Sequence, residues 1–291
     1  MALSDSKPIP HWIKEPARRG LRSMGRMTHS ARMTPDFLIV GAQRCGTTSL
    51  FKALRQHPAI LRGVLDKGVH YFDLAYDRDM AWYRGHFPLK AAARRVEDRL
   101  GVPAMTFESS PYYMFHPLSA ERIARDLPDV KLIALVRDPV ERAYSAHAHE
   151  LARDFETEPF ERALELEEER LRGEAERMVA DPAYLSFSMQ HHAYRARGRY
   201  AEQLERLERL FGRERVLVVD SHDFFETPEP IYDGVLEFLG LPRAEYPQFD
   251  RHNARPRSPM PDSVRAELDA HFQPFDERLA TWLGKPPSWR R

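Results

Sequence analysis

The chain has 291 residues, of which 42% are apolar, so it can bury a substantial core, and its length fits one large α/β domain or two modest ones. Its 44 basic and 44 acidic side chains balance, so no excess charge favours a nucleic acid or a membrane surface, and any anion site must be local. The only cysteine, Cys45, excludes an internal disulfide and a cysteine-based zinc site, which favours a reducing, cytoplasmic location.

Residues 1–34 predict a basic extension to a domain that covers 35–291. The extension carries seven lysine and arginine side chains against Asp5 and Glu15, and it lacks the apolar stretch of a signal peptide. Basic runs usually remain solvated, so we expect a solvated tail or a brace across the domain; a contact with lipid headgroups, weak and peripheral, is the lesser alternative. The apolar runs further on are much shorter than the roughly 20 residues of a membrane-spanning helix, so we expect no span.

The first regular elements are a short strand, a loop and a helix. The apolar run 37–40 follows Pro35 and predicts the strand, and residues 48–56 predict the helix, which stops before Pro58. Further runs at 105–107, 132–136 and 216–219 are separated by enough residues to contain amphipathic helices. This order predicts a parallel sheet covered by helices, as a single domain with inserted helices.

The loop between the first strand and helix, 41–48, predicts an anion site. Its backbone N–H groups and the dipole of the following helix would converge on an anion. The spacing matches a nucleotide-triphosphate P-loop through the second glycine, but Thr47 stands where that motif has lysine, which disfavours an ATPase or kinase. Arg44 offers a cation for one compact phosphate, and the hydroxyls of Thr47, Thr48 and Ser49 offer donors. A tight turn with an incidental arginine is the alternative.

A second anion site is predicted after the run that ends at Val136. Arg137 ends this strand, and Ser145 lies one or two turns into the helix that follows. A magnesium-dependent NTPase would need an acidic residue here; Asp138 could serve, but aspartate before proline at a helix start is more often a cap. Two phosphate-sized sites at neighbouring strand ends imply a nucleotide that is phosphorylated at two separate positions.

Two later stretches predict helices. Residues 150–177 are dense in glutamate and arginine, which predicts an exposed helix with ion pairs three or four residues apart. A second helix ends at Gly212. Its apolar face recurs at helical spacing and consists of Tyr200, Leu204, Leu207 and Phe211.

Both anion loops resemble motifs of sulfotransferases. Residues 35–50, PDFLIVGAQRCGTTSL, are similar to the 5′-phosphosulfate loop, and residues 135–145, LVRDPVERAYS, to the 3′-phosphate motif. The resemblance covers roughly residues 35–285 and is greatest to the heparan-sulfate-type and bacterial branch. Short motifs that follow the order of that branch are VHYFD at 69–73, WY at 82–83, ESSPY at 108–112 and GRY at 198–200.

This resemblance implies a P-loop-like α/β fold and a metal-independent enzyme. Its sulfuryl donor would be 3′-phosphoadenosine 5′-phosphosulfate (PAPS), and its acceptor a hydroxyl or amine of a carbohydrate, lipid or small metabolite. Arg137 and Ser145 would hold the 3′-phosphate, and Arg255 and Arg257, in a late basic loop, would close over the nucleotide. The residues implied for the 5′-phosphosulfate are Arg44, Cys45, Gly46, Thr47, Thr48 and Ser49.

Three positions depart from the family pattern. Arg44 stands where relatives usually carry lysine, Gly68 where they commonly place a glutamate base, and Ser109 where a basic residue often follows Glu108. The register of the resemblance implies that a glutamate at position 68 would be tolerated. A nucleotide kinase or NTPase stays the second hypothesis, and Gly68 motivates a third, a catalytically weak nucleotide-binding relative.

The catalytic prediction follows from these departures. Arg44 would stabilise the leaving phosphate, and with Gly68 unable to accept a proton, His70 becomes the leading base and Glu108 the reserve. The structural alternatives are a histidine hydrogen-bonded beneath the loop and, for Glu108, an ion pair with Arg44 or Lys67.

Overall fold

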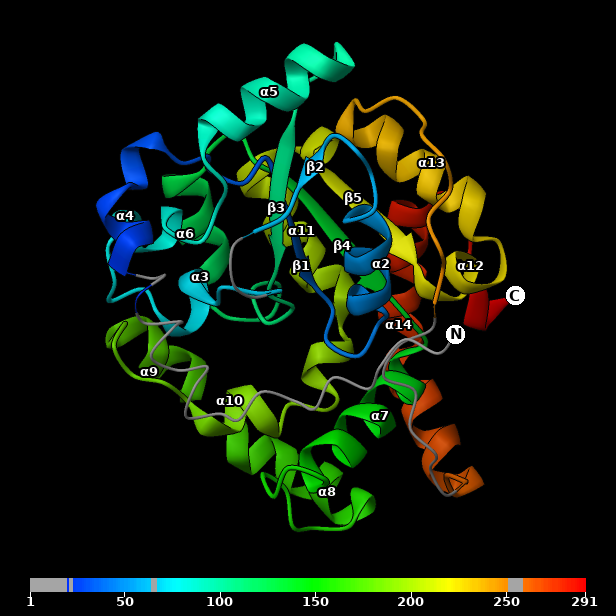
Figure 1. Ribbon diagram of the computed structural model, residues 1–291. Coiled ribbons are helices and arrows are strands. Elements are labelled where there is room, and N and C mark those ends of the chain that lie inside the picture. The colour runs from blue at the N-terminus through cyan, green and yellow to red at the C-terminus, as the bar shows by residue number, and fades with distance from the viewer. Residues whose placement is uncertain (1–19, 21–22, 64–66, 251–258) are drawn as a thin grey trace, which may run out of the picture.

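The described residues, 20, 23–63, 67–250 and 259–291 of a computed structural model, form one α/β domain (Figure 1). Its five strands make a single parallel sheet in the order β2-β3-β1-β4-β5. All four predicted runs are strands; the edge strand β2 was not predicted because it has only two residues. The strands are β1 (Phe37–Gly41), β2 (Ile60–Leu61), β3 (Met105–Ser109), β4 (Lys131–Val136) and β5 (Val216–Asp220).

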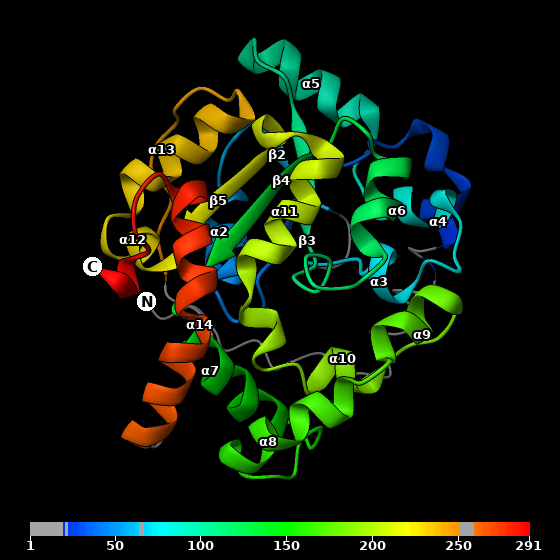
Figure 2. The same ribbon diagram turned by 180° about the vertical axis from the view of Figure 1, so that it is seen from behind.

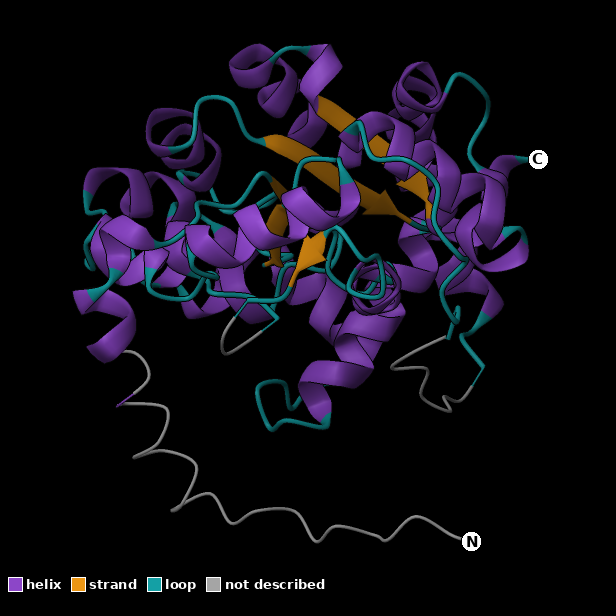
Figure 3. Ribbon diagram, turned by 45° about the horizontal axis from the view of Figure 1, so that its top comes forward, coloured by secondary structure: helices purple, strands orange, loops and turns teal. Residues whose placement is uncertain are grey.

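The central strand β1 is buried along its whole length because helices cover both faces of the sheet, as a parallel sheet requires. Helix α2 (Thr47–Leu54) lies on one face (Figure 1), and α11 (Tyr200–Phe211) and α14 (Asp262–Leu283) lie on the other (Figure 2). The predicted apolar face of α11 is buried, which confirms that helix. Figure 3 shows the strands enclosed by helices.

The remaining helices of the sheet layers lie around its ends and edges (Figures 1 and 2). They are α3 (Tyr71–Leu74), α4 (Met80–Arg84), α5 (Lys90–Leu100), α6 (Ser119–Asp126), α12 (Ser221–Glu226) and α13 (Pro228–Leu239), with short 3₁₀ turns η1 (His29–Ala31), η2 (Ala196–Gly198), η3 (Arg213–Arg215) and η4 (Ser288–Arg290).

Strands β1 and β4 are parallel neighbours, so they end at the same edge of the sheet. Their register shifts between Ile39 and Gly41, where β1 gives way to the loop, and the N–H of Ala42 donates to the carbonyl of Leu135 at 2.8 Å. The two predicted anion loops, which follow these strands, therefore lie side by side.

A group of helices lies beyond the carboxyl ends of the strands (Figure 1). It comprises α7 (Pro139–Leu151), α8 (Phe160–Leu171), α9 (Glu174–Ala180) and α10 (Phe187–His191). A second apolar cluster packs this group of helices against α14. In this cluster Val140 and Phe160 contact Leu268 and Phe272.

The prediction of one exposed helix over 150–177 is wrong. Parts of α7, α8 and α9 divide this stretch, and Glu150, Glu156 and Glu167 are buried. The high content of charged residues suggested an exposed helix, but these three carboxylates point into the protein and accept hydrogen bonds there. Glu167, for example, accepts from the backbone N–H groups of Arg195 and Ala196 at 2.7 and 2.9 Å.

Most of the predicted basic extension lies outside the described residues. Its last part packs on the domain: the Arg32 guanidinium donates to the carbonyl of Phe87, and Arg26 pairs with Asp79 at 2.5 Å between exposed side chains. These contacts are those of a brace. The division into 1–34 and 35–291 stays a prediction.

Candidate active site

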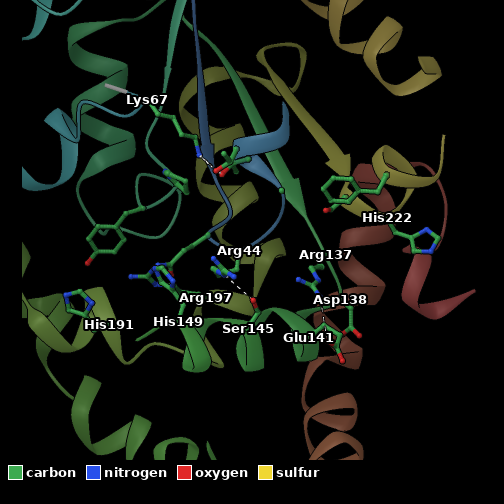
Figure 4. Close-up of a pocket in the computed structure, with 18 of the residues that line it drawn as sticks. Arg44, Lys67, Arg137, Asp138, Glu141, Ser145, His149, His191, Arg197 and His222 are labelled. Atoms are coloured by element: carbon green, nitrogen blue, oxygen red, sulfur yellow. Dashed lines mark hydrogen bonds and ion pairs between the residues drawn. The ribbon is translucent and has the colours of Figure 1, made fainter. Parts of the chain in front are cut away.

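A cleft of about 830 Å³ opens at the edge of the sheet where β1 and β4 end (Figure 4). Five lysine and arginine side chains line it against two carboxylates, Asp138 and Glu141, so its potential favours an anion. The five cations are Arg44, Lys67, Arg137, Arg153 and Arg197.

The loop after β1 presents the start of α2 to this cleft. Gly46 takes a left-handed conformation with φ of +85°, and a Cβ there would lie 3.1 Å from the Phe225 ring and from the Ser221 hydroxyl. In the described part of the chain no side chain caps α2, so the positive end of the helix dipole faces the cleft beside Thr47 and Thr48. This geometry fits the predicted anion loop.

The two predicted anion sites touch each other. Nε of Arg44 donates to Oγ of Ser145 on α7 at 3.1 Å (Figure 4). Arg137 lies close by, with its guanidinium 3.6 Å from the Glu141 carboxylate. Asp138 accepts from the N–H of Val140 at 2.9 Å and caps α7, which is the structural role expected for an aspartate before proline.

Not every predicted nucleotide residue lines the cleft. Cys45 is fully buried, with Sγ 3.5 Å from the hydroxyl of Tyr200, and Ser49 is buried on the inner face of α2. Neither side chain lines the cleft, whereas Arg44, Gly46, Thr47 and Thr48 do. Arg255 and Arg257 lie outside the described residues.

His70 lies on a second wall of the cleft, which is formed by the segment 67–73, and its side chain is 41% exposed. Its Nδ1 lies 2.9 Å from the carboxylate of Asp73, which is buried. With Asp73 ionised, Nδ1–H donates and Nε2 is left to accept a proton. Burial lowers the pKa of His70, but the hydrogen bond and charge of Asp73, with the charge of Glu108, outweigh it, so the pKa is raised.

Glu108, the predicted reserve base, lies behind this wall and does not line the cleft. Its carboxylate accepts four hydrogen bonds and is 1% exposed. Burial raises its pKa against the effect of these bonds. The donors are Val69 N–H at 2.7 Å and the hydroxyls of Ser110 at 2.6 Å, Tyr113 at 2.7 Å and Tyr83 at 3.0 Å. The expected ion pair with Arg44 or Lys67 is not formed among the described residues.

Gly68 is required by close backbone contact. A Cβ at this position would lie 2.5 Å from the carbonyl oxygen of Ser109 and 2.8 Å from Oγ of Ser110. The expectation that glutamate would be tolerated at position 68 is therefore wrong, since the backbone of Ser109 would have to move.

Three residues of the site were not predicted from the sequence to be functional: Lys67 and Arg197, which line the cleft, and Asp73, which is buried behind His70. Arg197 is buried beside the phosphate loop, where it donates to the side chain of Gln43 and stacks on the Tyr112 ring at 4.6 Å; burial lowers its pKa to about 10. Nothing in the local pattern around Arg197 distinguishes it from the many arginines of this chain. Asp73 ends the VHYFD stretch and lies three residues after His70, so that stretch could have pointed to it, and Lys67 lies three residues before His70.

Comparison with known proteins decides the family. Residues 34–254 match the family described as the sulfotransferase domain. The chain belongs to the sulfotransferase family. It is 30% identical over 282 residues to heparan sulfate glucosamine 3-O-sulfotransferase 6 of Mus musculus, covering 89% of this chain and 74% of the relative. A sulfotransferase structure from Alicyclobacillus acidocaldarius is 31% identical, with a TM-score of 0.66, over 89% of this chain and all of that one (100%).

The sulfotransferase is thus an enzyme with the P-loop-like α/β fold, and the kinase or NTPase alternative is set aside. The predicted cytoplasmic location is wrong. The finding against it is a further relative, 24% identical over 88% of this chain and 66% of its own length, which is the membrane-associated sulfotransferase kil1 of Dictyostelium discoideum. Among the described residues, none of the helices has the length and apolar character that a membrane crossing requires.

Proposed function

We propose that this sulfotransferase moves the sulfuryl group of PAPS to a hydroxyl or amine of a carbohydrate that itself carries anionic groups. The observation that carries the proposal is the contact between Arg44 and Ser145, because it joins the loop after β1 to the helix α7 that follows β4, in one basic site. A donor with phosphates at two positions needs two such loops. Nowhere in the described ranges do three or more histidine, cysteine, aspartate or glutamate side chains gather in a way that could hold a metal ion.

The residues that follow β1 and β4 have the chemical character needed to bind this nucleotide. The start of α2, with Thr47 and Thr48, would hold the 5′-phosphosulfate, and Arg137 with Ser145 would hold the 3′-phosphate. Arg44 lies between the two predicted phosphate sites, so its positive charge would stabilise the negative charge that develops on the leaving 5′-phosphate. These roles rest on the family resemblance and on the placement of the residues in one cleft.

Bound PAPS would supply an activated sulfur: as the acceptor oxygen or nitrogen bonds to it, the bond to the 5′-phosphate oxygen breaks and its electron pair stays on that oxygen. The protein's task is positioning and charge stabilisation, by analogy with phosphoryl transfer. His70 would accept the acceptor's proton on Nε2, while Asp73 holds the ring through Nδ1. Glu108 would act as a positioning residue through Val69.

The nature of the acceptor is supported by the wall beyond the phosphate loop. His149, Arg153, His191 and Arg197 line that part of the cleft. Relatives of this chain are named for heparan sulfate, a sulfated carbohydrate. The two arginines carry positive charge, although Arg153 lies 3.5 Å from the buried carboxylate of Glu150, which also contacts His191 at 2.9 Å. A polar wall with two arginines suits a carbohydrate with sulfate or carboxylate groups better than a neutral lipid.

Titration calorimetry tests the donor site. Adenosine 3′,5′-bisphosphate should bind in the presence of EDTA and more tightly than ATP; a preference for ATP, or a need for magnesium, would contradict the proposal. Transfer of labelled sulfate should then favour a heparan-type oligosaccharide over the same oligosaccharide with its sulfates removed. Tight bisphosphate binding with no transfer to either acceptor would favour the catalytically weak relative that Gly68 suggested.

A further inference from the structure

Lys67 brings an ammonium group to the phosphate loop from outside it. Its Nζ donates to Oγ1 of Thr47 at 3.1 Å and to Oγ1 of Thr48 at 3.0 Å (Figure 4). Thr47 is the residue that stands where a P-loop has its lysine. The loop has its own cation in Arg44, and Lys67 places a second one beside Thr47, where the P-loop lysine is absent.

The surroundings of Lys67 leave its charge available to a ligand. Burial lowers the pKa of this ammonium to about 8, and in the described part of the chain no carboxylate forms an ion pair with it. Two hydroxyl acceptors use two of its three protons, and the side chain lines the cleft. A partly buried ammonium without a counter-ion is costly, and an anion in the cleft would relieve that cost.

Lys67 is also fixed in place by its backbone. Its carbonyl accepts from the N–H of Ser109 at 2.9 Å, so the segment that carries Lys67 runs beside the end of β3. Ser109 is the position at which relatives often have a basic residue, and Lys67 supplies a cation next to it. Arg44 and His70 line the cleft with Lys67, and the carboxylates of Asp73 and Glu108 are buried behind them.

We infer that Lys67 binds the 5′-phosphosulfate end of the donor and stabilises the charge that grows on the leaving phosphate, in place of the missing loop lysine. The inference rests on the proposed function. In the transfer step the sulfur–oxygen bond to the 5′-phosphate breaks, and Lys67 stays protonated and shares the resulting negative charge with Arg44. The acceptor's proton goes to His70, not to Lys67.

The test compares Lys67→Met, Lys67→Arg and, as a matched control on the exposed side of α2, Lys52→Met. Lys67→Met should bind adenosine 3′,5′-bisphosphate about 10-fold or more weakly at pH 7, which is the scale of a lost charge-assisted contact, whereas Lys67→Arg should retain most of the affinity and Lys52→Met all of it. In the wild type, affinity should fall as the pH rises above about 8 because Lys67 loses its proton. This decline should be absent from both Lys67 variants, one being neutral and the other charged throughout.

The inference would be overturned if the wild type binds the bisphosphate and Lys67→Met binds it with the same affinity and the same pH dependence. The proposed function would stay intact in that case. A turnover that rises through pH 8 in the wild type, and not in Lys67→Met, would also overturn it by making Lys67 a base. If Lys67→Met does not fold, the pH dependence of bisphosphate affinity in Lys67→Arg decides the question. If the affinity of Lys67→Arg still falls above about pH 8 as it does in the wild type, Lys67 is not the cause of the fall, and the inference is overturned. Failure of the wild type to bind the bisphosphate would instead break the proposed function.

Discussion

The two walls of the cleft are held in shape by different kinds of interaction. The wall formed by the loops after β1 and β4 is set by strand ends and by the start of α2, and its arginines reach across it as separate cations. The wall that carries His70 is set by side chains, chiefly the four donors around Glu108 and the contact of His70 with Asp73. Substitutions in the first wall should therefore weaken binding one contact at a time, and those in the second should change chemistry or stability.

The largest expected effect separates chemistry from binding. His70→Ala should lower turnover by about 10²-fold or more, the usual scale for loss of a general base, while the affinity for adenosine 3′,5′-bisphosphate stays nearly unchanged. Turnover is measured with labelled donor and binding by calorimetry. His29→Ala, in η1 and away from the cleft, is the control. Full turnover in His70→Ala would remove His70 as the base.

The next prediction concerns the first wall. Arg137→Ala should weaken adenosine 3′,5′-bisphosphate by roughly 10-fold or more, on the scale of a charge-assisted contact of about 1.5–3 kcal/mol, because the 3′-phosphate would lose a cation. Adenosine 5′-phosphosulfate, which has no 3′-phosphate, should bind to the variant as it does to the wild type. Equal weakening of both ligands would show that Arg137 does not read the 3′-phosphate.

A smaller effect is expected on stability. Glu108→Gln replaces one acceptor oxygen by an NH₂ group among four donors, and leaving a buried donor without an acceptor costs about 1–3 kcal/mol. Urea denaturation should show this loss, and the exposed Glu121→Gln on α6 should stay within about 0.5 kcal/mol of the wild type. A Glu108→Gln protein as stable as the wild type would mean that the network tolerates an amide.

The contrast between the walls also explains what could be predicted from the sequence. The loop at 41–48 and the strand end at Arg137 are local patterns, so their structures and their proximity at one sheet edge followed from spacing and parallel topology. The second wall depends on contacts distant in sequence, such as Tyr83 with Glu108 and the N–H of His70 with Ser110, which no local pattern encodes. The need for glycine at position 68 was not predictable for the same reason, because it comes from the close approach of the Ser109 backbone, which is distant in sequence.

The smallest effect is a shift in pH dependence, and it tests how the second wall tunes its base. If neutral His70 accepts the proton, turnover in the wild type should rise with pH through the pKa of His70, which lies above its ordinary value of 6.5 although burial opposes the shift. Asp73→Asn keeps the shape and an acceptor for Nδ1–H but removes the negative charge that stabilises the protonated ring. The pKa of His70 should then fall, so the rising limb of the profile should move to lower pH, and at acidic pH the variant should retain a larger fraction of its own maximum than the wild type does. Asp73 also accepts from the N–H of Leu74 at 2.7 Å, so some loss of maximal turnover is expected from altered packing alone, but packing would not displace the limb. A limb that stays in place, or moves to higher pH, would mean that a group other than His70 sets the pH dependence.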